Sequence, residues 1–307
     1  MLTSLSSVLQ KAQKNHYAVG AFNVNNLEFI KAVVEAAEAE HSPVIISTSE
    51  GAIDYAGMEE LGTIVQIVSK RTNIPIVFHL DHGKKMDLVI DAIESGFYTS
   101  IMFDGSTLSY EKNIKQTKEL VKLAHKKKIS VEAELGAIAG IEDFVSIKER
   151  DAHLTSPEQV VDFVKQTGCD ALAIAIGTSH GAFKFKQDCR LDFKRLQEIR
   201  RGVNVPLVLH GASGVPKTVK HQCLQYGCKI EQAKGVSDVS IKKAVKLGIT
   251  KVNIDTDLRI AFDAGIRSFL QEYPEIIDPR QIMTHGKELI TKVVRQKIRL
   301  FGSSKRA

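Results

Sequence analysis

Three histidines of this sequence have the residue type and the setting of catalytic metal ligands. His82, His180 and His210 each directly precede a glycine, and each closely follows a short apolar run that is typical of a β-strand. Glycine lets the backbone approach a bound group closely, and three imidazoles that leave one coordination position open are a known catalytic zinc arrangement. A hydrogen-bonded histidine at a strand end is the alternative for any single one. Because the three lie far apart in the sequence, the metal hypothesis depends on a fold that gathers these strand ends.

Carboxylates accompany the histidines at the same strand ends. Asp81 directly precedes His82, Asp104 follows the next apolar run, and Glu132 and Glu134 alternate within the run after that. Carboxylates that face the interior of a sheet need partners or a metal. We therefore expect a second cation site that Asp104 completes, with an ion-pair network to Lys or Arg as the alternative.

Glycine and hydroxyl residues at the later strand ends suit a phosphate group. The segments GTSHG (177–181) and HGASG (210–214) follow two apolar runs, Thr256 follows another, and Lys184 lies nearby in sequence. Backbone N–H groups and hydroxyls in such loops cradle phosphate. The alternative is that these glycines serve only the geometry of tight turns.

The elements that must position these residues alternate along the chain. Short apolar runs expected as strands occupy 17–22, 43–48, 74–80, 99–103, 129–135, 171–176, 206–209 and 251–254. Their continuous apolarity is typical of strands that are covered on both faces. Stretches with helical spacing occupy 27–40, 58–70, 86–94, 111–127, 157–166, 193–200, 239–247 and 258–270.

Eight strand-then-helix units predict a parallel sheet that closes into a (β/α)8 TIM barrel. Additional helices are expected at 4–15 and 286–300, with residues 1–307 forming a single domain. A doubly wound open sheet is the alternative, but its G-x-G-x-x-G turn is not present in the sequence. In a barrel the strand ends form one rim, which would also carry Asn23 and Ser49. We interpret 221–240 as an insertion on a βα loop, which either closes over substrate or is a passive surface segment.

Composition and charge exclude several classes of protein. The 307 residues are 43% hydrophobic and 25% charged, unlike a disordered chain. No apolar stretch approaches the about 20 residues of a membrane helix. The net charge of +6 suits an acidic ligand, but basic and aromatic residues do not interleave as in a nucleic-acid groove. The four cysteines form no C-x-x-C pair and the N-terminus lacks a signal sequence, so we expect reduced thiols in a cytoplasmic protein.

Taken together, these residues resemble the class II, metal-dependent fructose-1,6-bisphosphate aldolases. The resemblance runs nearly from end to end of the chain. It is carried by YAVGAFNVNNLEF (17–29), SPVIISTSEGA (42–52), HLDHG (79–83), VEAELGAIAGIED (131–143), AIGTSHGAFK (175–184), PLVLHGASG (206–214), KVNIDTDLRIAF (251–262) and FGSS (301–304). The segment MFDGST (102–107) departs from the commoner M-I-D-A-S-H but keeps Asp104.

The resemblance implies a role for each matching residue. It implies catalytic zinc ligands at His82, His180 and His210, and a catalytic acid/base at Asp81. It implies a proton-moving glutamate of a mobile loop at Glu142, and a second, divalent or monovalent, cation at Asp104 and Glu134. The family's segments for dihydroxyacetone phosphate match Gly181, Gly211, Ala212, Ser213, Asn253, Ile254, Asp255 and Thr256. Ser49 and Arg259 match the glyceraldehyde-phosphate end, and Asn23 and Lys184 are expected to join the substrate site.

The implied activity is that of a lyase of glycolysis and gluconeogenesis. It cleaves fructose 1,6-bisphosphate reversibly to dihydroxyacetone phosphate and glyceraldehyde 3-phosphate, with zinc polarising the ketose carbonyl and Asp81 removing the C4 hydroxyl proton. This mechanism needs no Schiff base on Lys184 or Lys251. The resemblance also implies a homodimer or homotetramer that binds sugar phosphates and neither nucleic acid nor membrane. A tagatose-1,6-bisphosphate aldolase is the near alternative, and a catalytically silent phosphate- or RNA-binding barrel is the remote one.

Overall fold

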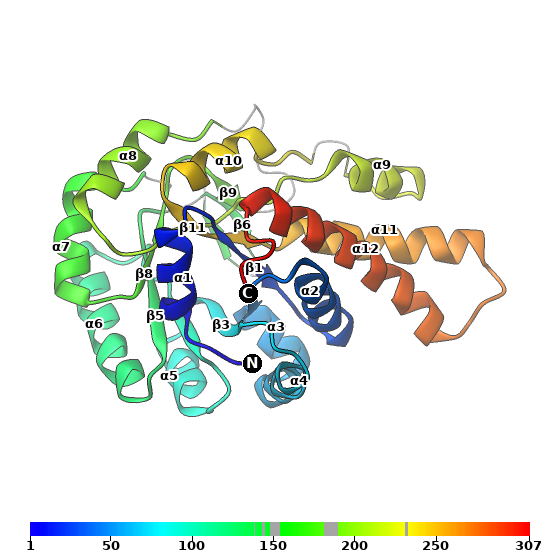
Figure 1. The fold of residues 1–307 in the computed structure, drawn as a ribbon, viewed down its shortest axis with the longest axis horizontal. Coiled ribbons are helices and arrows are strands. Elements are labelled where there is room, and N and C mark those ends of the chain that lie inside the picture. The colour runs from blue at the N-terminus through cyan, green and yellow to red at the C-terminus, as the bar shows by residue number, and fades with distance from the viewer. Residues whose placement is uncertain (138, 143–144, 148–153, 181–189, 231–232) are drawn as a thin grey trace.

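A closed parallel barrel forms the centre of the computed structural model (Figure 1). The model describes residues 1–137, 139–142, 145–147, 154–180, 190–230 and 233–307. The strands follow one another around the barrel in the order β1-β11-β10-β8-β5-β4-β3-β2. The predicted TIM barrel is confirmed, and the closure excludes the open doubly wound sheet.

The eight barrel strands coincide with the eight apolar runs to within a few residues. They are β1 (Val19–Asn23), β2 (Val44–Thr48), β3 (Ile76–Gly83), β4 (Ser100–Phe103), β5 (Ser130–Leu135), β8 (Ala171–Ile174), β10 (Leu207–Leu209) and β11 (Ile249–Ile254). Every residue in these strands is buried. Helices cover one face of the sheet and the barrel interior covers the other, so most of the strand residues on both faces are apolar.

The predicted helices are present around the barrel. Those after the first strands are α2 (Leu27–Glu40), α3 (Glu50–Ala56), α4 (Met58–Lys70), α5 (Met86–Glu94) and α6 (Tyr110–Lys126). The remainder are α7 (Pro157–Thr167), α8 (Phe193–Gly202), α9 (Lys217–Gln225), α10 (Asp238–Lys246), α11 (Thr256–Glu272) and α12 (Pro279–Phe301). Side chains that accept a backbone N–H begin several of them, as Asn26 does for α2 and Ser109 for α6.

The N-terminal helix α1 (Leu5–Lys14) packs against the interior of the barrel. Its Leu5 and Leu9 share one apolar cluster with inward-facing strand residues such as Ile45 and Val77. The barrel interior is therefore a packed core, and the polar side chains of the strand ends are left at one rim.

Three features differ from the predicted elements. The C-terminal helix α12 begins at Pro279, because Asp278 caps it and proline suits the first helical position. It packs along α11, and the two helices project from the barrel (Figure 1). A small sheet of β6 (Ala139–Glu142), β7 (Val145–Ile147) and β9 (Ser179–His180) lies outside the barrel, and the helices α3 and α9 were not predicted.

The segment 221–240 is partly helical. It contains the end of α9 and the start of α10, and α9 packs against α11. The prediction of reduced thiols was wrong for two cysteines of this segment, because Cys223 and Cys228 form a disulfide. The turn after α9 brings the two side chains together, which their spacing in the sequence did not indicate. Within the described ranges, no helix combines the length and the apolarity that crossing a membrane requires.

Candidate active site

The C-terminal strand ends bring five of the predicted polar side chains into one buried cluster. Asp81 and His82 end β3, Asn23 ends β1, His210 follows β10 and Asn253 lies in β11. All five are at most 8% exposed. Parallel strands of a closed barrel end at the same rim, which is why residues far apart in sequence meet here.

The rings of His82 and His210 face one another. Nε2 of His82 lies 2.7 Å from Nδ1 of His210. The opposite nitrogens contact carboxylates: Nδ1 of His82 lies 3.2 Å from Asp104, and Nε2 of His210 lies 2.8 Å from Glu132. Carboxylates accept hydrogen bonds, so the ring protons belong on those outer nitrogens. One ring nitrogen of each histidine and a carboxylate oxygen of Asp81 lie within 4.8 Å of one another, a spacing that could hold a metal ion.

The backbone at His82 is unusual. His82 has φ of +48°, and the register between β3 and β4 shifts between Leu80 and Gly83. A non-glycine residue in this region carries strain, and such strain concentrates at functional sites. A bulge re-aims the side chains beside it, and here it lets both Asp81 and His82, although adjacent, reach the cluster.

Two amides hold the carboxylate of Asp81. Asn23 donates from Nδ2 to Oδ2 at 2.9 Å, and Asn253 donates from Nδ2 to Oδ1 at 2.8 Å. Nδ2 of Asn253 also lies 3.3 Å from Nδ1 of His210. Two neutral donors orient a carboxylate without neutralising it, which suits a group that accepts a proton.

A second group of possible ligands lies on the outer side of His82. Oxygens of Asp104 and Glu134 and a ring nitrogen of His82 all lie within 4.8 Å of one another. Lys84 also contacts Asp104, with its Nζ 3.3 Å away. Burial raises the pKa of Asp104, but the hydrogen bond from His82 and the charge of Lys84 outweigh it and hold this pKa well below its usual range. Both expected arrangements, a cation site and an ion pair, thus have support at this position.

A buried ionic network lies beneath the histidines. Lys251 Nζ lies 2.8 Å from Oε2 of Glu132 and 3.4 Å from Nε2 of His79, which contacts Ser100 through its other nitrogen. All of these side chains are fully buried. Burial, together with the nearby Lys251, lowers the pKa of His79 to about 3. Sequence reasoning assigned no role to Lys251 or His79, although a charged residue within a strand expected to be covered on both faces was a signal.

The loop after His210 is held by a buried acid that sequence reasoning also missed. The Asp257 carboxylate accepts from the N–H groups of Gly214 and Val215, at 2.9 and 2.7 Å, and from Lys297 at 2.8 Å. Burial alone would raise the pKa of Asp257. The charge and the hydrogen bond of Lys297 outweigh burial, so this pKa lies below its ordinary value. Asp257 and Lys297 therefore hold the backbone of the loop that carries Ser213.

A pocket at the rim brings Ser49 and Arg259, predicted for the glyceraldehyde-phosphate end, together with other predicted substrate residues. Its volume is about 510 Å³, and its lining includes Asn23, Ser49, Asp255 and Arg259. Nε of Arg259 donates to Asp255 at 2.7 Å, and Oγ of Ser213 accepts from the Asp255 N–H at 3.4 Å. These contacts join the pocket to the loop after His210.

The remaining predicted residues are described in part or not at all. Gly181 and Lys184 lie outside the described residues, and His180 and Glu142 are described in their backbone, where Gly140 of β6 pairs with His180 of β9. Gly211 packs against the start of β9 with φ of +61°, and a Cβ there would lie 2.6 Å from the Ser179 carbonyl oxygen. Ser179, which precedes His180, and Gly211, which follows His210, are therefore in contact. Ala212 and Ile254 are buried, and Thr256 begins α11.

The comparisons with known proteins agree with this site. A family profile described as fructose-bisphosphate aldolase class-II matches residues 3–306. The chain is 45% identical to the fructose-bisphosphate aldolase of Thermus caldophilus, over 100% of both chains. It is also 45% identical to that of Helicobacter pylori strain 26695, over 99% of both. The crystal structure of the YdjI aldolase from Escherichia coli K12 superposes with a TM-score of 0.82 at 34% identity, with 100% of each chain covered. The chain therefore belongs to the class II fructose-bisphosphate aldolase family, whose members are lyases.

Proposed function

We propose that this protein cleaves fructose 1,6-bisphosphate reversibly to dihydroxyacetone phosphate and glyceraldehyde 3-phosphate, with zinc as its cofactor. The observation that carries the proposal is the 2.7 Å approach of His82 Nε2 and His210 Nδ1 beside the oriented carboxylate of Asp81. Family membership and the names of the 45% identical relatives support the substrate.

The residues present fit a zinc ion. His82 and His210 offer imidazole nitrogens whose opposite ring nitrogens contact carboxylates, as in many zinc sites. His180 is proposed as the third ligand. This is supported by the close packing of Gly211, which follows His210, against Ser179, which precedes His180. Bound zinc would supply Lewis-acid polarisation of the ketose carbonyl.

Asp81 is proposed as the base that accepts the C4 hydroxyl proton while the C3–C4 bond breaks. Asn23 and Asn253 hold its two oxygens, so the carboxylate can present a lone pair to substrate without rotating. Glu142 is proposed to return a proton to C3 of the triose phosphate. The separation of these two roles lets cleavage and triose deprotonation be affected independently.

The two phosphates are proposed to bind at opposite ends of the rim. The segments 211–213 and 253–256, together with Gly181, would receive the phosphate of dihydroxyacetone phosphate through N–H groups and the Ser213 hydroxyl. Ser49 and Arg259 would receive the other phosphate, and the rim pocket that they line supports this placement. Lys184 is proposed to join the substrate site near the segments for dihydroxyacetone phosphate. Asp104 and Glu134 are proposed as ligands of a second, divalent or monovalent, cation.

One coupled assay tests the proposal. Cleavage of fructose and tagatose bisphosphates is measured with and without prolonged chelation, beside metal analysis. We expect about one zinc per chain, preference for the fructose epimer, and loss of activity on metal removal. Full activity without metal, with borohydride trapping substrate on a lysine, would overturn the zinc mechanism, and preference for the tagatose epimer would reassign the substrate.

Three further properties are proposed from the family alone. We propose that residues 1–307 act as one domain, that the protein forms a homodimer or homotetramer, and that it works in the cytoplasm in glycolysis and gluconeogenesis. Light scattering tests the assembly, and fractionation of cells tests the location.

A further inference from the structure

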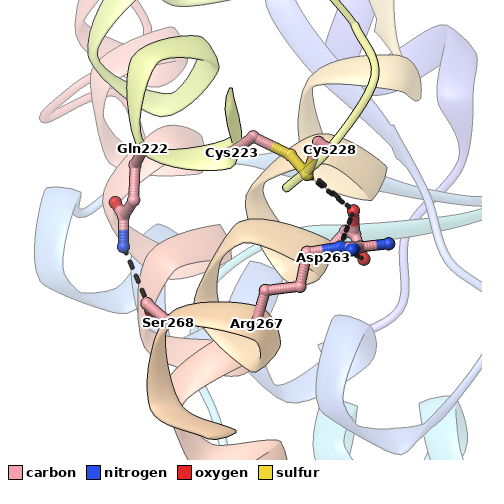
Figure 2. Close-up of a disulfide and its surroundings, with 6 residues drawn as sticks. All are labelled: Gln222, Cys223, Cys228, Asp263, Arg267 and Ser268. Atoms are coloured by element: carbon pink, nitrogen blue, oxygen red, sulfur yellow. Dashed lines mark hydrogen bonds and ion pairs between the residues drawn. A yellow bond between two sulfur atoms is a disulfide. The ribbon is translucent and has the colours of Figure 1, made fainter. Parts of the chain in front are cut away.

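Cys223 and Cys228 lie together at the C-terminal end of α9 (Figure 2). They are joined by a disulfide, and their residues are 1% and 7% exposed. The Cys228 N–H donates to the Cys223 carbonyl at 2.9 Å. This backbone turn holds the two sulfurs close to one another whether or not a bond joins them.

The carboxylate of Asp263, on α11, approaches both sulfurs. Its Oδ2 lies 3.0 Å from Sγ of Cys228 and 3.7 Å from Sγ of Cys223. Arg267, one turn further along α11, donates from Nε to both oxygens of Asp263 at 2.9 Å. Figure 2 shows this chain of contacts from Arg267 through Asp263 to the sulfurs. The two side chains are 45% and 47% exposed, so this ion pair favours, without locking, the direction in which the carboxylate meets the sulfurs.

These contacts favour the dithiol over the disulfide. An ionised carboxylate only accepts hydrogen bonds, and a thiol has an S–H to donate, whereas a disulfide sulfur has no proton. Reduction therefore gives Asp263 new donors at the distances observed, and oxidation leaves its charged oxygen against sulfur lone pairs. A disulfide whose reduced form is stabilised is easily reduced.

We propose that Cys223 and Cys228 form a reversible redox site, which low-molecular-weight thiols reduce and the corresponding disulfides oxidise. In reduction, one thiolate of a dithiol attacks Sγ of Cys228, the more exposed of the pair. The S–S bond breaks, and the Cys223 sulfur leaves with the electron pair and takes a proton. The second thiol of the reagent then displaces Cys228, which also takes a proton, and the reagent closes to a cyclic disulfide.

The redox site is connected to the loop that carries Ser213. The Val236 N–H donates to the Ser213 carbonyl at 3.1 Å, and a Cβ at Gly235 would lie only 2.4 Å from that oxygen. Lys220, on α9, donates to the Ala233 carbonyl at 2.8 Å. Reduction removes the covalent link between α9 and Cys228. Cys228 precedes the segment 233–236 that backs the Ser213 loop, so we expect this segment to be held less firmly in the dithiol form.

The test equilibrates the protein in glutathione buffers of graded potential, followed by differential alkylation and peptide mass analysis of each cysteine. We expect the wild-type pair to interconvert reversibly. Asp263→Asn should shift the equilibrium constant toward the disulfide by about tenfold or more, equivalent to about 30 mV. The control is Glu272→Gln, which removes another carboxylate of α11, one that accepts from the Tyr226 hydroxyl and not from sulfur. We expect it to change the constant by less than about twofold.

Three results would overturn the proposal. The first is an equilibrium constant that Asp263→Asn leaves unchanged, and the second is a disulfide that resists strongly reducing buffer. The third is a second zinc that binds on reduction and is lost in Cys228→Ser, which would assign the two thiols and Asp263 to a metal.

Hydrogen exchange tests the connection to the Ser213 loop. The Val236 amide should exchange faster in the reduced protein, whereas the Gly214 and Val215 amides, held by Asp257, should exchange equally in both states. Equal exchange of Val236 in both states would remove the connection. Neither the glutathione nor the exchange measurement uses aldol cleavage, so their failure and a failure of the proposed function are distinguishable.

Discussion

The ammonium of Lys251 lies 2.8 Å from the carboxylate of Glu132 inside the barrel, where both side chains are fully buried. The other oxygen of Glu132 contacts His210 Nε2 at 2.8 Å. Burial raises the pKa of Glu132, but Lys251 and His210 outweigh it and hold this pKa well below its usual range. A buried lysine thus keeps ionised the carboxylate that orients a proposed zinc ligand.

Removing this lysine should therefore weaken both the fold and the metal site. In Lys251→Met we expect the free energy of unfolding to fall by about 3 kcal/mol or more, because a buried carboxylate loses its partner. We expect zinc affinity to fall roughly 10- to 100-fold, since the carboxylate behind His210 is no longer held ionised. Denaturant titration of the metal-free protein and zinc titration against a chelator measure the two effects.

Two variants separate these effects from a general loss of charge. Lys287→Met breaks the exposed pair with Glu35, whose atoms lie 2.8 Å apart, and should cost less than about 1 kcal/mol. The double variant Lys251→Met/Glu132→Gln removes both buried charges and should recover stability but not zinc affinity. If Lys251→Met binds zinc as tightly as the wild-type protein, Glu132 does not act on the metal through its charge.

Asp81 and His82 are adjacent in sequence, but we expect their substitutions to affect zinc binding and cleavage differently. His82→Ala should lose zinc and cleavage together. Asp81→Ala should keep zinc near wild-type occupancy and lose cleavage by roughly 10²–10⁴, the usual effect of a positioned base. Exchange of the C3 proton of dihydroxyacetone phosphate should be spared relative to cleavage in Asp81→Ala. Metal analysis beside both assays decides this, and equal zinc loss in the two variants would make Asp81 a ligand or a fold determinant.

Gly211 should be required for zinc binding for a steric reason. In Gly211→Ala the new Cβ meets the Ser179 carbonyl oxygen at 2.6 Å, so the chain that enters His180 must move. We expect zinc affinity to fall by about tenfold or more. Gly96→Ala is the matched control, because Gly96 also has positive φ but has no atom within 4 Å of its Cβ position. It should lower the melting temperature and leave zinc affinity unchanged. A similar affinity loss in both variants would rule out the steric explanation.

Glu40 should make the fold sensitive to acid. The hydrogen bonds from Arg299, Arg295 and Ser304 together outweigh burial, which alone would raise the pKa of Glu40, and they lower this pKa to about 2. Because the folded pKa lies below the unfolded one, the stabilisation is present above about pH 4.5 and is lost as the pH falls toward 2. The melting temperature of metal-free protein should thus exceed that of Glu40→Gln at pH 7, and the difference should shrink below pH 4.5. A difference that stays constant from pH 7 to pH 3 would contradict this origin.

The barrel could be predicted because its signals are local. Each strand appears in the sequence as a continuous apolar run, and each helix as an apolar stripe such as that of α2. The site residues could be listed for the same reason, since parallel strands of a closed barrel end at one rim. That reasoning placed Asp81, His82, His210, Asn23 and Asn253 together, and the structure confirms their meeting.

The partners of these residues were not predictable in the same way. Neither the positive φ at His82 nor the hydrogen bonds from the Ser213 loop to Asp257 leave a pattern in any short stretch of sequence. An ion pair for Glu132 was expected as an alternative, but its partner Lys251 was not identified. The pairing of Cys223 with Cys228 and the approach of Asp263 depend on how α9 packs against α11. The sequence by itself determined which residues stand at the rim, because hydrophobic periodicity acts over a few neighbouring residues. Only the tertiary structure decided which histidine nitrogens face one another and which charges are neutralised, because those depend on distances between side chains that the closed barrel brings together.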